Sequence, residues 1–134
     1  MKRLRGYIFS RPFLGERVPQ HVQNIVIRDY CKKFNFQYLL SATEYAMENS
    51  FLMMEETLNE LKHIDGIVAY SMYQLPSDTE KRSAIYKRVL SEGKSLHFAV
   101  EGISLYDEVS CKRIEDIWKI RLTLPNCLNY KQVV

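Results

Sequence analysis

The sequence has no long apolar run, and this absence argues against a membrane span. All its apolar stretches are far shorter than the roughly 20 residues that cross a bilayer. Lys2, Arg3 and Arg5 lie near the start, but no extended apolar segment follows them as it would in a secretory signal. We therefore expect a cytoplasmic protein with no membrane partner.

Cysteine is scarce, and standard metal and nucleotide motifs are missing. The three cysteines, Cys31, Cys111 and Cys127, are odd in number and widely spaced, which predicts reduced thiols. Neither they nor the three histidines have the spacing of metal ligands, so we expect no metal site. A Walker-type loop and a Gly-x-Gly-x-x-Gly motif are both absent, and we expect no cofactor.

The chain also lacks a concentrated charge of one sign. Its 19 basic and 16 acidic residues are interleaved and leave a net charge of +3. Because nucleic-acid binding needs a concentrated basic face, this pattern disfavours nucleic acid as a partner. With 134 residues, 46% of them hydrophobic, the chain predicts one folded domain over 1–134 that builds its core without disulfides or metal.

Short apolar runs alternate with helical patterns along the chain. In the first helical pattern, Val22, Ile25, Val26 and Tyr30 have the spacing of one helix face. The alternation predicts an α/β fold of three layers, a mainly parallel sheet of four or more strands with helices on both faces. The predicted strands are Leu4–Ser10, Phe36–Glu44, Gly66–Met72 and Leu96–Glu101, and the predicted helices are Pro19–Phe34, Phe51–Lys62 with Ser50 as N-cap, Thr79–Glu92 and Asp107–Leu122.

Ligands of such sheets bind beyond the carboxyl ends of the strands. The segment after the first strand has the chemistry of an anion site, because Arg11 and Arg17 precede a helix N-terminus that offers free N–H groups. Gln20 and Asn24 follow on one helix face, and Gln74 lies after the third strand. We expect these five residues to bind substrate; the alternative is a solvated polar face with scattered loop arginines.

Four side chains at the same edge are candidates for catalysis. Glu44 and Glu101 end the second and fourth strands and have the chemistry of a general acid or base, or of ligands for sugar hydroxyls. His21 near a helix N-terminus is expected to stay neutral. Ser10 ends the first strand, but no activating base is adjacent in sequence. The structural alternatives are helix or turn caps and internal ion pairs.

One resemblance is to the catalytic domain of serine recombinases of the resolvase/invertase type, over roughly residues 5–105. Gly6-Tyr7 followed by Ser10 is similar to the first strand and nucleophile of that family. The family pattern Asp-Arg-Leu-x-Arg after the third strand is here Tyr73-Gln74-Leu75-Pro76-Ser77. Gln74 and Ser77 thus stand where the resemblance implies arginines, and neither replaces a permanent cation in phosphoryl transfer.

A second resemblance covers almost the whole chain and is to the bacterial "sporadic carbohydrate cluster protein" family. It implies a role in surface-polysaccharide synthesis but no particular reaction. The phrases that carry it are Gly6-Tyr7-Ile8-Phe9-Ser10-Arg11-Pro12-Phe13, Arg17-Val18-Pro19-Gln20-His21-Val22-Gln23-Asn24, Leu40-Ser41-Ala42-Thr43-Glu44-Tyr45-Ala46-Met47 and Leu96-His97-Phe98-Ala99-Val100-Glu101-Gly102.

Together these patterns favour an enzyme or enzyme-like protein of bacterial surface-carbohydrate synthesis. We expect its ligand to be an anionic sugar metabolite, such as a sugar phosphate, nucleotide sugar or acidic sugar, and its reaction to be an acid–base isomerisation, epimerisation or dehydration. The alternatives are a non-catalytic binding or regulatory partner of a carbohydrate enzyme, and a degenerate recombinase-like domain that binds DNA. A homo-oligomer is left open. Convergence of Ser10, His21, Glu44 and Glu101 in one pocket would favour catalysis.

Overall fold

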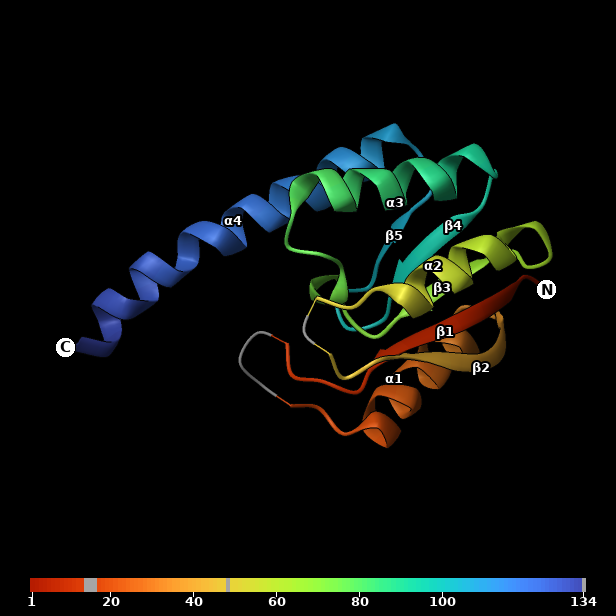
Figure 1. The fold of residues 1–134 in the computed structure, drawn as a ribbon, viewed down its shortest axis with the longest axis horizontal. Helices are drawn as coiled ribbons and strands as arrows, with labels where there is room; N and C mark the ends of the chain where they lie inside the picture. Colours follow the sequence, from red (N-terminus) through yellow and green to blue (C-terminus); the bar gives the residue numbers. More distant parts are fainter. Residues whose placement is uncertain (14–16, 48, 134) are drawn as a thin grey trace.

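A computed structural model describes residues 1–13, 17–47 and 49–133, with the backbone alone for 121–133. Within these residues, five strands form one sheet in the order β2-β1-β3-β4-β5 (Figure 1). The strands are β1 (Arg3–Phe9), β2 (Gln37–Glu44), β3 (Gly66–Ala69), β4 (Ser95–Phe98) and β5 (Ile103–Leu105); the α-helices are α1 (Gln20–Lys33), α2 (Leu52–Asn59), α3 (Thr79–Ser91) and α4 (Glu108–Val133), and two short 3₁₀ turns are η1 (Glu60–Lys62) and η2 (Met72–Gln74).

The sheet confirms the predicted mainly parallel α/β architecture. β1 runs parallel to β2 and β3, and β3 runs parallel to β4. β5 was not predicted and pairs antiparallel with β4. The chain reverses between them at Gly102, whose φ of +66° favours glycine. A strand of three residues is too short to show an alternating pattern, so the sequence did not reveal it.

Helices cover both faces of the sheet (Figure 1). Side chains alternate across β1: Leu4 and Ile8 pack with Ile27 of α1 on one face. Tyr7 and Phe9 point to the other face, where the larger core lies. That core takes its helical side chains from α2, α3 and α4: Met54, Leu58, Ile85, Val89, Ile114 and Trp118.

The buried face of α1 differs from the predicted one. Gln23, Ile27, Tyr30 and Cys31 are its buried residues, whereas Ile25 is 59% exposed. Four apolar residues between positions 22 and 27 permit more than one helical stripe. The polar members of the observed stripe explain the choice, because the Gln23 amide and the Tyr30 hydroxyl both have buried hydrogen-bond partners in strands of the sheet, Phe9 of β1 and His97 of β4.

Two helix ends also differ from prediction. The N-cap of α2 is Phe51 rather than Ser50, and it forms no side-chain cap. α4 continues from Glu108 to Val133, beyond the predicted end at Leu122, and its last turns extend away from the sheet (Figure 1). Although α4 has 26 residues, no helix among the described residues is both long and apolar enough to cross a membrane. The side chain of Cys127 lies outside the described residues.

Arg82 joins α3 to α4. Its side chain is 2% exposed and forms two 2.9 Å hydrogen bonds to the Glu115 carboxylate, while its guanidinium lies 4.1 Å from the Trp118 ring centroid. The Tyr86 hydroxyl donates to the same carboxylate at 2.6 Å. Burial alone would raise the pKa of Glu115, but the bonds from Arg82 and Tyr86 lower it. A paired Arg is thus buried without an uncompensated charge.

His97 lies in β4 and is buried among polar partners. Its Nδ1 is 3.0 Å from the Tyr30 hydroxyl and 2.8 Å from the Ser104 hydroxyl, and its Nε2 is 2.8 Å from the Ser95 hydroxyl. Burial, with a smaller contribution from the positive charge of Lys2, lowers the pKa of His97 from 6.5 to about 4. The folded protein therefore holds this imidazole neutral in mildly acidic solution.

The first prediction concerns stability below neutral pH. The unfolded chain protonates His97 below pH 6.5, whereas the folded chain does so only near a pKa of about 4. The free energy of unfolding should therefore fall as the pH drops through this window, by about 3 kcal/mol in all. Urea unfolding at several pH values would measure it. His97→Gln should be less stable at pH 7 and less dependent on pH; an equal pH slope in both proteins would contradict the assignment.

Candidate functional site

The direction of the strand order reverses between β1 and β3. From β1 the chain goes to β2 on one side and then returns to β3 on the other. Open parallel sheets bind ligands outside the carboxyl ends of strands at such a switch point. The segments that follow the parallel strands β1, β2, β3 and β4 lie at this edge, and we call them together the carboxyl edge.

Gln23 closes the end of β1 at the switch point. The last β1–β3 pair is Tyr7 with Ala69, so Phe9 lies beyond the reach of β3. The Gln23 amide takes the place of the missing strand: its Oε1 accepts from the Phe9 N–H at 2.9 Å, and its Nε2 donates to the Phe9 carbonyl at 3.0 Å. Sequence analysis missed Gln23, although its spacing of four from Ile27 was a usable signal.

Gln74, predicted to bind substrate, lies beneath the carboxyl edge. It is 0% exposed, and its Nε2 donates to the Gln23 Oε1 at 2.8 Å. Its Oε1 accepts from the Ser71 N–H at 3.3 Å as part of the cap of η2. Both ends of the amide therefore have protein partners, and Gln74 positions the segment after β3.

The Glu44 carboxylate joins the end of β2 to the start of α2. The side chain is 1% exposed. It accepts five hydrogen bonds, two of them from the Met53 and Met54 N–H groups at 3.1 Å; the other donors are the Tyr7 and Ser50 hydroxyls and the Tyr45 N–H. The Glu44 carboxylate thus accepts from free N–H groups in the first turn of α2 and lies near the positive end of the helix dipole. The sequence had predicted Ser50 as the cap of this helix.

Ser10 and Arg11 hold the loop that follows β2. The Ser10 hydroxyl donates to the Glu44 carbonyl at 2.6 Å. Arg11 donates to the Tyr45 and Met47 carbonyls at 2.9 and 3.1 Å, and its guanidinium lies 4.2 Å from the Phe9 ring centroid. These contacts give Arg11 a role in holding the loop after β2.

The remaining predicted residues surround the start of α1. Arg17, Gln20 and His21 are exposed, and Arg17 makes no ion pair with any residue that the structure describes. Among the described residues, Pro19 stands at the N-cap of α1 without a side-chain cap hydrogen bond, and the first turn of the helix has no acidic residue. Asn24 instead faces β2, where its Oδ1 accepts from the Ser41 and Tyr38 hydroxyls. Residues 14–16 of the predicted anion loop lie outside the described residues.

A cavity of about 180 Å³ opens at the carboxyl edge, and we call it the edge pocket. Backbone pairing beyond the strands positions Glu101 there, because the Val100 N–H donates to the Tyr70 carbonyl at 2.9 Å. The Glu101 carboxylate accepts from the Ser71 hydroxyl at 2.8 Å and from the Met72 N–H at 2.9 Å. The pocket is lined by Phe13, Val18, Tyr70, Ser71, Tyr73, Val100 and Glu101.

The four predicted catalytic side chains do not form one hydrogen-bonded set. Ser10 bonds the backbone of Glu44, the Glu44 carboxylate faces α2, and Glu101 bonds the segment after β3. Of the four, Glu101 lines the edge pocket. Among the described residues, no group of three or more His, Cys, Asp or Glu side chains is arranged to hold a metal ion.

Comparisons with known proteins identify the fold. The sequence matches no protein-family model and no curated protein. The structure is similar to a resolvase-family site-specific recombinase from Streptococcus pneumoniae, with a TM-score of 0.63 and 9% identity over 96% of this chain and 99% of that one. It is also similar to the N-terminal catalytic domain of TP901-1 integrase, with a TM-score of 0.61 and 14% identity over 92% and 98%. The chain thus has the fold of resolvase-type catalytic domains.

The second prediction tests the structural role of Glu44. Glu44→Gln places an NH₂ group among five hydrogen-bond donors and should lower the free energy of unfolding by roughly 1–3 kcal/mol. Chemical denaturation would measure the change. Glu56→Gln is the matched control, since Glu56 is exposed on the same helix. Equal stability of the two variants would show that Glu44 does not anchor α2.

Proposed function

We propose that the protein binds a small anionic sugar metabolite in the edge pocket and serves bacterial surface-carbohydrate synthesis as a non-catalytic binding partner. One observation carries this proposal: the Glu101 carboxylate and the Ser71 hydroxyl share a cavity with three aromatic side chains. Ligand sites commonly combine apolar and aromatic walls with a few polar groups. Here the carboxylate and hydroxyl would bind sugar hydroxyls, and Phe13, Tyr70 and Tyr73 would contact the apolar side of the ring.

Arg17 is the residue we assign to the anion. It precedes Val18, which lines the edge pocket, and it is exposed at the start of α1. The uncapped N-terminus of α1 adds N–H groups and the positive end of the helix dipole. A phosphate or carboxylate on the sugar would thus meet Arg17 and the first turn of α1, near Gln20 and His21, whereas Arg11 is engaged elsewhere.

Binding is favoured over catalysis by the use of the other polar groups. Isomerisation, epimerisation or dehydration of a sugar needs a positioned acid and base. Glu44 already accepts five hydrogen bonds, and Ser10 donates to a backbone carbonyl. Glu101 shares its pocket with Tyr70 and Tyr73, but with no histidine, lysine or second carboxylate among the described residues that line it. The resemblance to the sporadic carbohydrate cluster family supports the assignment to a carbohydrate pathway.

The third prediction tests this site with glucose 6-phosphate and UDP-glucose in calorimetric titrations. At least one should bind, and both Glu101→Gln and Arg17→Gln should weaken that binding by roughly tenfold or more, because each removes a charged hydrogen-bonding group. Glu92→Gln, an exposed carboxylate at the end of α3, is the control and should bind as the wild type does. Binding that survives both site variants would remove the edge pocket from the proposal.

A second candidate function is DNA binding by a degenerate recombinase domain. The fold similarity to recombinase catalytic domains is the observation that favours it. The residues of the edge do not support strand cleavage: the Ser10 hydroxyl donates to the Glu44 carbonyl, and Gln74 is buried against Gln23 at a position where the resemblance implies an arginine. We therefore rank this candidate second.

The fourth prediction concerns recombinase chemistry. The purified protein should neither cleave supercoiled plasmid nor form a covalent adduct with it on a denaturing gel, because no arginine stands at positions 74 and 77 to stabilise phosphoryl-transfer charge. The Ser10→Ala variant supplies the background. A protein–DNA adduct that disappears in Ser10→Ala would overturn this prediction and favour the recombinase assignment.

A further inference from the structure

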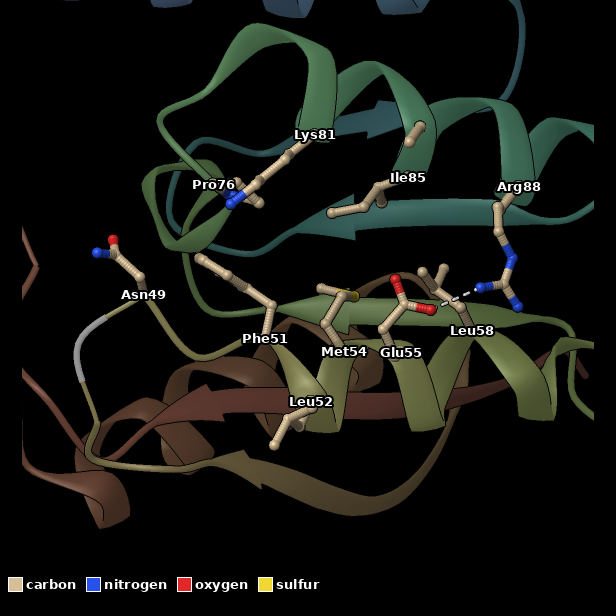
Figure 2. Close-up of a pocket in the computed structure, with 11 residues that line it drawn as sticks. Asn49, Phe51, Leu52, Met54, Glu55, Leu58, Pro76, Lys81, Ile85 and Arg88 are labelled. Carbon is tan, nitrogen blue, oxygen red and sulfur yellow. Dashed lines mark hydrogen bonds and ion pairs between the residues drawn. The ribbon is translucent and has the colours of Figure 1, made fainter.

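A separate groove lies between α2 and α3 (Figure 2). Its volume is about 330 Å³, and it shares no lining residue with the edge pocket. A volume of this size has room for a compact ligand. Its walls come from the start of α2, the segment before α3 and one face of α3. We call it the α2–α3 groove.

The interior of the groove is apolar. Met54, Leu58 and Ile85 form part of its lining, and all three belong to the main core with at most 5% exposure. Phe51 and Pro76 extend the apolar surface toward one end, where Figure 2 shows them on opposite walls. Ala84 adds a small, exposed side chain from α3. An apolar segment of a ligand would be removed from water by these contacts.

The charges of the groove are unequal at its two ends. At one end, Arg88 pairs with Glu55 at 2.9 Å and donates to the Asn59 side chain at 2.7 Å. At the other, Lys81 is exposed and makes no ion pair or hydrogen bond with any residue that the structure describes. Figure 2 shows the Lys81 amine beside Pro76, away from the Arg88–Glu55 pair. Among the residues that the structure describes, the groove thus has one positive charge without an ion-pair partner, Lys81, at the end formed by Pro76.

We propose that the α2–α3 groove binds a free medium-chain fatty acid. The alkyl chain lies along Met54, Leu58 and Ile85, and the carboxylate meets the Lys81 ammonium. A single carboxylate matches the single free cation. A phosphate dianion is better matched by several cations or by the planar fork of an arginine, and the guanidinium of Arg88 is already paired.

The test is a calorimetric titration of the full chain with decanoate below its micellar concentration. Decanoate should bind with a stoichiometry of one and octanoate roughly tenfold more weakly, because two buried methylenes are lost. Lys81→Gln should weaken decanoate binding by about tenfold or more. Lys87→Gln removes an exposed lysine from the same helix that does not line the groove, and it should leave affinity unchanged. Decyltrimethylammonium, with the same chain and the opposite charge, should not bind.

Ala84→Trp supplies an independent check, since it fills the groove from an exposed helix position and leaves the core side chains in place. It should unfold thermally like the wild type and lose decanoate binding. Sedimentation should give both proteins the same oligomeric state. The proposal is overturned if decanoate does not bind, if Lys81→Gln and Lys87→Gln bind equally, if the ammonium analogue competes, or if the wild type is a dimer that Ala84→Trp dissociates.

Discussion

The Glu44 carboxylate is the constraint on which the carboxyl edge depends. It ends β2, accepts hydrogen bonds from the first turn of α2 and from the Tyr7 hydroxyl of β1, and is almost fully buried. A buried carboxylate is stable only when its oxygens are satisfied, so these donors must all be in place together. That requirement places α2 against β1 and β2. It also positions the carbonyl groups at 44, 45 and 47 that Ser10 and Arg11 bind.

The amide pair of Gln23 and Gln74 has the corresponding role on the β3 side of β1. Together with Glu44, it uses most of the polar side chains that the sequence places at this edge to hold loops and helix ends. Polar side chains whose hydrogen bonds are already formed within the protein are less available to a ligand. Of the predicted site residues, Glu101 lines the edge pocket, and Arg17, Gln20 and His21 are exposed. This division is the reason for proposing a binding site rather than a catalytic one.

The similarity to recombinase catalytic domains illustrates that a similar fold does not imply the same chemistry. The fold is shared with those domains at identities of only 9% and 14%. Function depends on the side chains at the edge of the sheet, and a fold of this kind accommodates different sets of them. In this chain, the buried polar residues continue the hydrogen bonding of the sheet, and the arginine with the most protein partners, Arg82, holds two helices together.

The sequence by itself determined the order and type of most elements, because hydrophobic periodicity is a local property. The predicted strands and helices through Glu92 overlap those observed, and Gly93 follows α3 with the positive φ that ends a helix. Only the tertiary structure decided the rotation of α1, the cap of α2 and the burial of Gln74. Each depends on hydrogen bonds between residues far apart in the chain, such as Gln74 and Gln23, 51 positions apart. Periodicity has no information on which distant donor meets which acceptor, so the edge pocket and the polar groups that line it could be identified only in the folded chain.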